Sequence, residues 1–389
     1  MAHIAWLGKK SPFCGNVTYG LSTTDALRKR GHAVSFIHFD TPATALGGRS
    51  DPAESAGAAP DVTLPYLVKS QVYTIPSPGA QRELRESLER LRPDLVHASL
   101  TLSPLDFRLP DLCRPLDLPL VATFHPPFDA GLRNLTAGTQ QLTYQLYAPS
   151  LARYDRVIVF SALQADLLER LGVPGERLAV IPNGVDTDLW CPAPARPGPE
   201  LQELRQRFAD RRVFLYLGRV ATEKNVEALL RAWRLVRPEG CVLVVVGDGP
   251  LRPSLQSGTE SDVIWWGYES RTAYRIALLQ LAEVFLLPSL VEGLSLALLE
   301  AMACGTACVA TDAGADGEVL AGGSGIVIST QGVTTQLRTL LPVLRDQPVL
   351  TAELGRRARQ RVLERYTLLG NIDALERLYG ELLRQPVAA

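Results

Sequence analysis

The chain has 389 residues, a length that suggests about two or three domains, each able to bury its own core. It carries 40 basic and 41 acidic side chains and a net charge of −1, so its charge gives no indication of a nucleic-acid partner. Apolar residues make up 46% of the chain and aromatic residues 7%, as in ordinary soluble globular proteins.

The N-terminus and the cysteines indicate a cytoplasmic protein. The opening Met-Ala-His-Ile-Ala-Trp-Leu-Gly reads as a short strand and lacks the charged start and apolar centre of a signal peptide. No run reaches the roughly 18 apolar residues of a membrane-spanning helix. Six cysteines without a Cys-x-x-Cys pair, and only five histidines, argue against a zinc site, so we expect reduced thiols.

Strand and helix patterns alternate through the first half of the chain. We expect strands at residues 3–7, 33–38, 95–98, 120–124, 156–160 and 178–181. Helix patterns cover residues 16–30, where Gly31 follows as a C-cap, and residues 81–92. Residues 41–61 are rich in Ala, Gly, Pro and Ser and are predicted to form a mobile loop.

A proline-rich segment at residues 191–199 separates off a second half with the same alternation. Its four prolines exclude a helix or a central strand, so we interpret it as a linker. Beyond it we expect strands at 213–217, 242–246, 263–266, 284–287 and 307–310, and helices at 224–236, 294–303, 333–345, 350–366 and 371–384. The alternation predicts an α/β protein with two doubly wound domains, residues 1–190 and 191–366.

Glu292 lies in a turn between an apolar strand and a helix pattern. The turn Glu292-Gly293 presents a carboxylate and unpaired backbone N–H groups at the start of the helix, and Glu300 follows about two turns into it. A hydroxyl-rich ligand whose anionic end meets the helix dipole suits such a turn, and a nucleotide sugar is a ligand of this kind. The alternative is an exposed glutamate pair on a helix.

Two cations follow the first strand of the second half. Arg219 comes directly after strand 213–217 and Lys224 opens the next helix, so both can face the carboxyl edge of the sheet. A diphosphate that leaves a sugar needs fixed positive partners for its developing charge. On spacing alone, a solvated surface pair is an equal alternative.

Two segments of the first half indicate a second ligand-binding edge. The loop Gly8-Lys-Lys-Ser-Pro-Phe-Cys-Gly-Asn16 feeds a helix N-terminus, which can bind phosphate, and Lys9 and Lys10 either meet an anion or are solvated. The loop is neither Gly-x-Gly-x-x-Gly nor a Walker loop, which argues against NAD or ATP. His125 ends strand 120–124, and the prolines after it hold it extended toward the crevice. A structural histidine is the alternative.

These motifs resemble those of retaining GT-B glycosyltransferases of family 4, and they occur in the same order. They are the strand-end His125, Ile181-Pro-Asn-Gly-Val-Asp186, Gly218-Arg-Val-Ala-Thr-Glu-Lys224-Asn, Val246-Gly-Asp-Gly-Pro250, and Glu292-x7-Glu300 followed by Ala-Met-Ala-Cys-Gly-Thr. The resemblance covers the whole chain. It implies two Rossmann-like domains that face each other across a cleft, with a C-terminal helix, at about residues 367–389, that crosses back to the first domain.

The resemblance also implies roles for the matched residues. Arg219 and Lys224 would hold the phosphates, Glu292 and His125 would contact the donor sugar, and these four are the expected catalytic residues. Glu300 would bond the ribose. The remaining expected donor contacts are Gly15, Asn16, Gly247, Asp248, Gly267 and Tyr268 near the nucleotide, and Gly293, Leu294, Ser295 and Leu296 at the helix start.

The sequence departs from the family pattern at two points. Many members have Gly-Gly where this chain has Cys14-Gly15, and Pro126 replaces the usual Asp after the histidine, where Asp129 is a candidate substitute. Asp186-Thr-Asp188 looks like the metal-binding Asp-x-Asp of the other large glycosyltransferase fold, but it follows the Pro-Asn-Gly-Val motif at a strand end. We therefore expect no essential metal and no cofactor beyond a UDP-sugar as co-substrate.

The acceptor is expected to bind the first domain. Residues 139–153 contain no acidic side chain but carry Tyr144 and Tyr147, and Phe107 lies beside Arg108. Together with Lys9 and Lys10, these residues suit a membrane interface, while Tyr144 and Tyr147 suit a buried helix equally well. The passages around Lys9, Phe107 and His125 resemble those of cyanobacterial digalactosyldiacylglycerol synthases. This narrower resemblance implies transfer of galactose from UDP-galactose to monogalactosyldiacylglycerol by a peripheral membrane protein.

The leading prediction is therefore a metal-independent, retaining hexosyltransferase with a nucleotide-sugar donor and a glycolipid acceptor at a membrane surface. A soluble sugar or polysaccharide is the alternative acceptor. A nucleotide-sugar-binding protein without transfer activity is the alternative of another class, and the intact Arg219, Lys224, Glu292 and Glu300 argue against it. The sequence makes no prediction of the oligomeric state.

Overall fold

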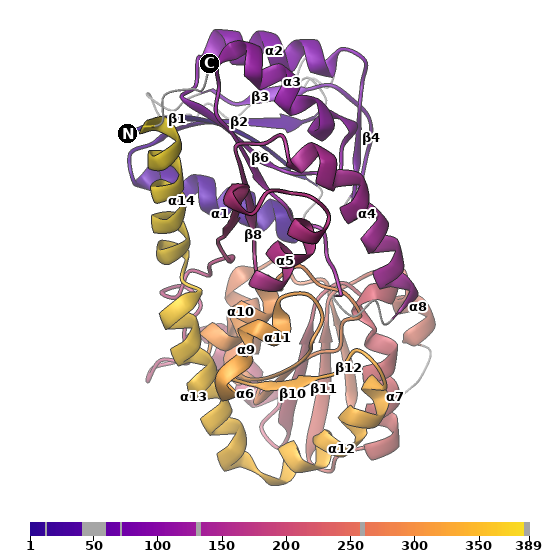
Figure 1. The fold of residues 1–389 in the computed structure, drawn as a ribbon. Helices are drawn as coiled ribbons and strands as arrows, with labels where there is room; N and C mark the ends of the chain where they lie inside the picture. The colour runs from indigo at the N-terminus through magenta and orange to yellow at the C-terminus, as the bar shows by residue number, and fades with distance from the viewer. Residues whose placement is uncertain (12–13, 41–59, 71, 130–133, 257–260, 385–389) are drawn as a thin grey trace. The chain divides into compact units, whose positions relative to one another are not determined.

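The computed structural model describes residues 1–11, 14–40, 60–70, 72–129, 134–256 and 261–384. It contains two compact units (Figure 1). The first comprises Met1–His125, Thr143–Ile181 and Asn371–Ala389, and the second comprises Pro126–Leu142 and Pro182–Gly370. Most of the expected loop at 41–61, namely residues 41–59, lies outside the described residues.

The first unit is built on a seven-stranded sheet in the order β3-β2-β1-β6-β7-β8-β9. All six neighbouring pairs are parallel. The strands are β1 His3–Gly8, β2 Ala33–Phe39, β3 Val62–Leu64, β6 Leu95–Ser99, β7 Leu120–Thr123, β8 Arg156–Val159 and β9 Leu178–Val180. Because the chain starts in the middle and later continues on the other side of β1, the strand order reverses between β1 and β6.

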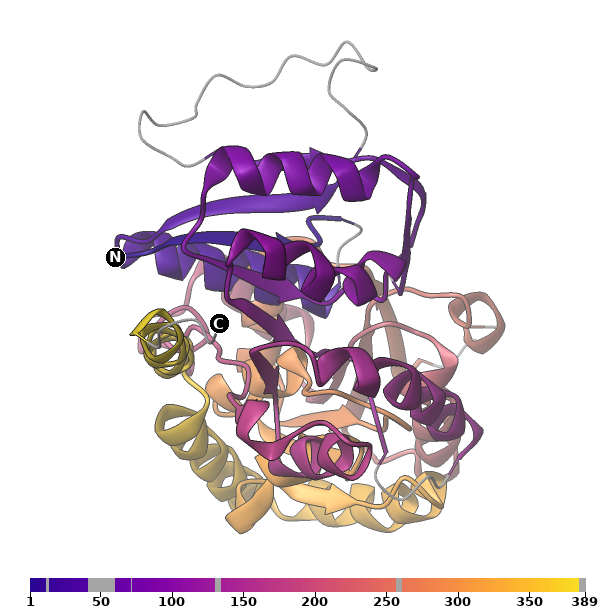
Figure 2. The same cartoon turned by 45° about the horizontal axis from the view of Figure 1, so that its top comes forward.

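Helices cover both faces of this sheet. Helix α1 (Gly15–Lys29) and helix α2 (Ala80–Leu91) lie on opposite faces (Figure 2). The other helices that contribute to the unit are α3 Leu109–Cys113, α4 Leu135–Leu151, α5 Ala162–Arg170 and α14 Leu368–Arg384. A 3-10 turn, η2, covers Pro104–Arg108, and a small hairpin pairs β4 Tyr66–Lys69 with β5 Thr74–Pro76. Parallel strands buried on both faces read as continuous apolar runs, which is why the central strands β1, β2, β6, β7 and β8 were visible in the sequence.

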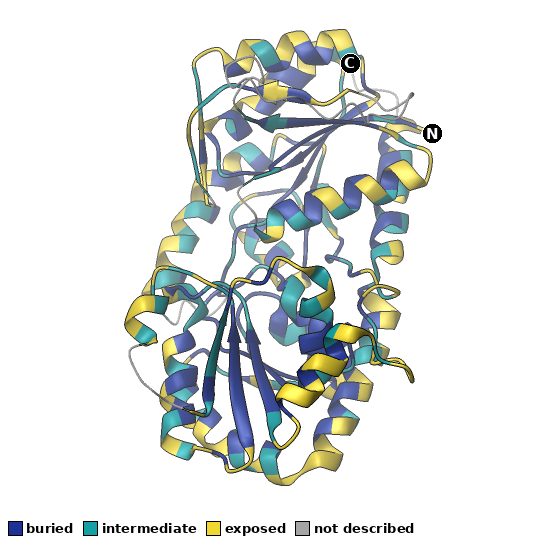
Figure 3. Cartoon of the chain, turned by 180° about the vertical axis from the view of Figure 1, so that it is seen from behind, coloured by how far each residue is buried: buried dark blue, intermediate teal, exposed yellow. Residues whose placement is uncertain are grey.

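The second unit repeats this design with a six-stranded parallel sheet in the order β12-β11-β10-β13-β14-β15. The strands are β10 Arg212–Leu217, β11 Cys241–Val246, β12 Val263–Gly267, β13 Val284–Leu287, β14 Ala307–Thr311 and β15 Ile326–Ile328. The helices are α6 Pro199–Arg207, α7 Val226–Val236, α8 Arg252–Leu255, α9 Thr272–Leu281, α10 Leu296–Ala303, α11 Asp316–Val319, α12 Val333–Asp346 and α13 Pro348–Arg365. The central strands are buried, and exposed residues lie on the helices and loops around them (Figure 3). Here the strand order reverses between β10 and β13.

The predicted α/β class with doubly wound parallel sheets is confirmed. The sequence reading missed the short strands β3 and β15 and the β4–β5 hairpin, because three or four residues are too few to establish a period. It also omitted α5. Within the described ranges, no helix combines the length and apolarity needed to cross a bilayer.

The C-terminal helix α14 packs into the first unit through a buried hydrogen bond. The Tyr379 hydroxyl lies 2.5 Å from Nδ1 of His97, whose Nε2 lies 2.7 Å from the Thr123 hydroxyl. All three side chains are buried. Burial lowers the pKa of His97 to about 3, so the imidazole is neutral and holds one proton between its two partners.

Candidate functional site

The loops after β10 and β13 meet where the strand order of the second sheet reverses. Asn225 Nδ2 donates to the carbonyl of Pro288 at 3.2 Å, and the N–H of Leu290 donates to the carbonyl of Glu223 at 2.8 Å. The two hydrogen bonds hold together segments that lie far apart in the sequence. In open parallel sheets this is the position at which ligands bind.

Lys224 and Glu292 form the central ion pair of this edge. Lys224 Nζ lies 2.5 Å from Glu292 Oε1, and the Ser289 hydroxyl donates to the same oxygen at 2.7 Å. Glu292 is only 6% exposed, while the Lys224 side chain is 23% exposed. The carboxylate is thus held in place, and the ammonium above it can still reach an anion from solvent.

Arg219 is brought to the same loop but has a different partner. Its guanidinium pairs with Glu223, and its carbonyl accepts a hydrogen bond from the Tyr216 hydroxyl at 2.7 Å. The Arg219 side chain is 38% exposed. The structure therefore places both predicted cations on the segment that follows β10, with room for each to meet an anionic ligand.

Asp316 is a site residue that the sequence analysis missed. Its Oδ1 accepts a hydrogen bond from the N–H of Ser295 at 3.0 Å, and its Oδ2 has no hydrogen-bond partner among the described residues. Burial, followed by the nearby charge of Glu292, raises the pKa of this carboxyl well above its usual range. The available signal was an aspartate a few residues after β14, the strand that neighbours β13.

Helix α10 begins two residues later than predicted. Ser295 is its N-cap and accepts a hydrogen bond from the N–H of Leu298 at 3.3 Å. Of the three predicted phosphate-binding amides, that of Ser295 is donated to Asp316, while Leu294 and Leu296 flank the cap. Gly293 is tied to this turn because its carbonyl accepts from the N–H of Ala315 at 2.8 Å.

Glu300 lies just over one turn into α10 rather than two. It is buried, and this burial raises its pKa to about 7, while the charge of Arg275 acts in the opposite direction. A carboxyl of this kind can accept or donate a hydrogen bond near neutral pH.

Two glycines allow backbones to approach each other closely at the sheet edge. Gly247 has a φ of +136°, and a Cβ there would lie 1.8 Å from the carbonyl oxygen of Gly218. Its N–H donates to the carbonyl of Gly267 at 2.7 Å, which links the ends of β10, β11 and β12. Gly314, with a φ of +56°, would place a Cβ 1.9 Å from the carbonyl oxygen of Glu292. No larger residue fits either position without a backbone shift.

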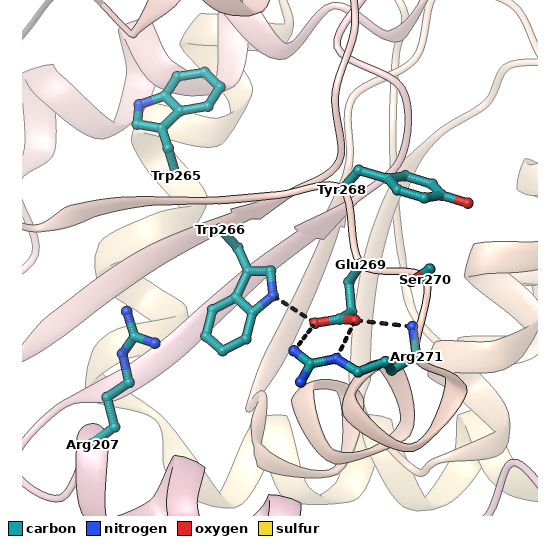
Figure 4. Close-up of a pocket in the computed structure, with 7 residues that line it drawn as sticks. All are labelled: Arg207, Trp265, Trp266, Tyr268, Glu269, Ser270 and Arg271. Carbon is teal, nitrogen blue, oxygen red and sulfur yellow. Dashed lines mark hydrogen bonds and ion pairs between the residues drawn. The ribbon is translucent and has the colours of Figure 1, made fainter.

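The predicted nucleotide-side residues lie along this edge. Asp248 is exposed and pairs with Arg252 at 3.3 Å, and Tyr268 is 61% exposed. Next to Tyr268 is a surface pocket of about 470 Å³ (Figure 4), lined by Arg207, Trp265, Trp266, Tyr268, Glu269, Ser270 and Arg271.

The pocket is organised around the carboxylate of Glu269. It accepts hydrogen bonds from Trp266 Nε1 at 3.1 Å and from the Arg271 guanidinium at 2.8 and 2.9 Å (Figure 4). The bonds from Arg271 hold the pKa of Glu269 low, at about 2. Because this carboxylate is already paired, it orders the loop after Gly267.

In the first unit, His125 joins a chain of polar side chains at the ends of β1, β6 and β7. Its Nε2 lies 2.8 Å from the Ser99 hydroxyl, which donates to Asn16 Oδ1 at 3.0 Å. Burial and the nearby charge of Lys9 lower the pKa of His125 to about 3, so the ring is neutral. Asn16 therefore uses its side chain within the unit, while Gly15 before it is exposed.

The two lysines of the N-terminal loop differ in environment. Lys9 is buried, which lowers its pKa, and its Nζ donates to the carbonyl of Ser70 at 3.4 Å. Lys10 pairs with Asp61 and lies 5.1 Å from the centre of the Phe36 ring. Both cations thus have partners inside the unit.

The aromatic residues proposed for the acceptor divide between core and surface. Tyr144 and Tyr147 are buried, with hydroxyls bonded to Gln164 at 2.9 Å and to Asp106 at 2.8 Å. Phe107, half-buried, packs on Tyr147 with ring centres 4.6 Å apart, while Arg108 is exposed. In this structure the two tyrosines belong to the core.

The Asp-x-Asp sequence has a structural use. Asp186 Oδ1 accepts from the N–H groups of Asp188 and Leu189, both at 3.1 Å, and so closes a turn. In the part of the chain that the structure describes, no group of three or more His, Cys, Asp or Glu side chains is placed to hold a metal ion. Asp129 is buried in the segment that packs with the second unit.

Family models match most of the chain. Residues 15–189 match the model described as Glycosyltransferase Family 4, and residues 211–346 match the model described as Glycosyl transferases group 1. The two matches together cover the loop of Gly15 and Asn16, His125, and the sheet edge that carries Lys224 and Glu292.

Curated relatives include the alpha-maltose-1-phosphate synthases of Mycolicibacterium smegmatis and Mycobacterium tuberculosis. The first is 30% identical over 250 residues, 59% of this chain and 64% of that protein. The second is 30% identical over 271 residues, 64% of this chain and 70% of that protein. The chain thus spans about two thirds of the length of these relatives.

Among solved structures, Anabaena HepE in complex with UDP-glucose is similar over almost the whole chain. The TM-score is 0.76 at 19% sequence identity, and the match covers 98% of this chain and 100% of the other. At this identity the match concerns the fold, and it agrees with the predicted GT-B architecture.

Proposed function

The chain belongs to the family 4 glycosyltransferases, and from this we propose that it transfers a hexosyl group from a UDP-sugar to a hydroxyl of an acceptor. The observation that carries the proposal is the Lys224–Glu292 pair at the point where the strand order of the second sheet reverses. The UDP-glucose of HepE, a protein of the same fold, supports a UDP-sugar as donor.

The proposed mechanism assigns charge stabilisation to the second unit. As the sugar–phosphate bond breaks, Lys224 and Arg219 neutralise the departing diphosphate, together with backbone N–H groups at the start of α10. Glu292, fixed by Lys224 and Ser289, orients the hexose. The acceptor oxygen bonds the anomeric carbon on the face that the diphosphate leaves, and the departing phosphate takes the proton of the acceptor hydroxyl. We propose retention of configuration, as the family resemblance implies, and no metal, because two side-chain cations can supply the positive charge.

Two acceptor classes follow from different observations. The mycobacterial relatives are named alpha-maltose-1-phosphate synthases, which supports a soluble sugar phosphate as acceptor. Exposed apolar side chains support a glycolipid, with galactose as the hexose and monogalactosyldiacylglycerol as the acceptor. Leu135, Leu142 and Leu146 of α4 are exposed at spacings of seven and four, which places them on one helix face. The β4–β5 hairpin adds Leu67, Val68, Val72, Tyr73 and Ile75.

A product screen tests the proposal. The purified protein is incubated with UDP-glucose or UDP-galactose, and with either glucose 1-phosphate or vesicles that contain monogalactosyldiacylglycerol, with and without EDTA. Mass spectrometry of the lipid extract and of the aqueous phase should show a hexosylated product. NMR of this product should show retained configuration at the anomeric carbon. A lipid product selects the glycolipid acceptor, and a water-phase product removes it. Loss of the product with EDTA would contradict metal independence.

A further inference from the structure

Three consecutive strand ends of the first sheet bring Asn16, Ser99 and His125 together. Asn16 begins α1 after β1, Ser99 ends β6, and His125 follows β7. Ser99 lies opposite Thr123 in the β6–β7 register, so the hydroxyl and the imidazole two residues later share one edge. Ser99 is buried, and its hydroxyl therefore exchanges hydrogen bonds with these neighbours rather than with bulk water.

The carbonyl of Leu100 determines the orientation of the Asn16 amide. Asn16 Nδ2 donates to this carbonyl at 3.0 Å. The opposite orientation would set two acceptor oxygens against each other, so the amide oxygen must face Ser99. The Ser99 hydroxyl then donates its single proton to Asn16 Oδ1 at 3.0 Å.

A hydroxyl that has used its proton on Asn16 can only accept from His125. His125 Nε2, at 2.8 Å, must therefore carry the proton of the neutral ring. The ring is also held by aromatic neighbours, Tyr19 at 5.1 Å and Phe160 at 5.2 Å between ring centres. The network thus sets both the tautomer and the orientation of the imidazole.

We infer that Asn16 and Ser99 are positioning residues that hold His125 in the Nε2–H tautomer, so that Nδ1 accepts a hydrogen bond from a hydroxyl of the bound sugar. This inference rests on the proposed function for the identity of the ligand, but the tautomer itself rests only on the hydrogen bonds of the first unit. The backbone of Leu100 thereby selects a hydrogen-bond acceptor, rather than a donor, for the ligand.

NMR of the full chain labelled with ¹⁵N at histidine tests the tautomer directly. His125→Gln assigns the resonances among the five histidines. The unsubstituted protein should show His125 protonated at Nε2 and unprotonated at Nδ1. Ser99→Ala and Asn16→Ala should each convert this pattern into a mixture of tautomers, while Ser99→Thr, which keeps the hydroxyl, should retain it. Protonation at Nδ1 in the unsubstituted protein, or no change in Ser99→Ala, would overturn the inference.

Ligand titration and kinetics test whether Nδ1 of His125 accepts a hydrogen bond from the bound sugar. UDP-glucose or UDP-galactose should shift the Nδ1 resonance of His125 more than that of Nε2, and Ser99→Ala should lower kcat/KM by about tenfold, the effect of one net hydrogen bond. Ser99→Thr should recover most of this loss. If neither UDP-glucose nor UDP-galactose shifted the Nδ1 resonance, His125 would not accept a hydrogen bond from the sugar. If the protein showed the predicted tautomer but transferred no hexosyl group, only the proposed function would be contradicted.

Discussion

At the residue scale, Lys224 is a single charge with two possible partners. In the structure it pairs with Glu292, and in the proposed reaction it must also meet the departing diphosphate. The desolvated carboxylate keeps the ammonium at the sheet edge, so the cation needs little rearrangement when negative charge develops.

Lys224→Ala should therefore lower kcat by about 100-fold or more, the loss typical for one charge-stabilising group. Arg231→Ala is the matched control, because Arg231 is an exposed cation on α7 that pairs only with Glu227 on the helix surface in the described contacts. Initial rates with UDP-sugar at saturation measure both. Product formation by Lys224→Ala at the rate of the control would contradict the phosphate role.

The buried Glu300 makes stability depend on pH. Its pKa is about 7 in the folded protein, above the usual glutamate value of 4.5, so the folded state holds the proton more tightly than the unfolded chain does. Its contribution to stability is complete below about pH 4.5 and is lost as the pH rises toward 7. Glu300→Gln should remove this loss.

Thermal denaturation at pH 5 and pH 8 measures the effect. The fall in Tm between the two values should be smaller in Glu300→Gln than in the unsubstituted protein. Glu381→Gln, at an exposed position on α14, should leave that difference unchanged. Equal falls in all three proteins would show that Glu300 does not carry the pH dependence.

At the element scale, the turn after β11 depends on the absence of a side chain. Gly247→Ala would combine a positive φ with a contact of 1.8 Å to the Gly218 carbonyl oxygen, so β10 and β11 would have to separate at the site. We expect a destabilisation of about 2 kcal/mol or more.

Gly138→Ala should have the opposite effect on stability from Gly247→Ala. Gly138 lies inside α4, and a Cβ there meets nothing within 4 Å. This substitution should stabilise the protein by about 0.5–1 kcal/mol, because alanine loses less conformational freedom in a helix. Urea denaturation followed by circular dichroism compares the two variants. A Gly247→Ala protein as stable as the parent would mean that the strand ends adjust without cost.

At the scale of the whole molecule, the C-terminal helix contributes a buried hydroxyl to the first unit. Tyr379→Phe removes the hydroxyl that bonds Nδ1 of the neutral His97, at a cost of about 1–3 kcal/mol. Because the two sheets belong to separate compact units, amide exchange should accelerate in β6 and stay unchanged in β11.

Hydrogen exchange monitored by mass spectrometry resolves the two sheets. Tyr73→Phe, at an exposed tyrosine of the same unit, controls for loss of a hydroxyl at the surface. Equal acceleration in β6 and β11 would mean that the whole chain unfolds as one unit, and no acceleration would mean that the Tyr379–His97 bond does not contribute to stability.

The sequence by itself determined the alternation of buried strands and helices, the α/β class, and the positions of polar residues at strand ends. These properties depend on neighbours in the chain: apolar runs, turn residues and caps. Arg219, Lys224 and Glu292 were visible because each follows an apolar strand directly or within a few residues.

The tertiary structure alone decided which of these polar groups meet. It paired Lys224 with Glu292, added Asp316 to the α10 cap, placed Tyr144 and Tyr147 in the core, and linked Asn16 and Ser99 to His125. Hydrogen bonds and burial depend on groups that lie far apart in the chain, and the order of strands in each sheet brings them together. No local pattern encodes that order, which is why these contacts could not be read from the sequence.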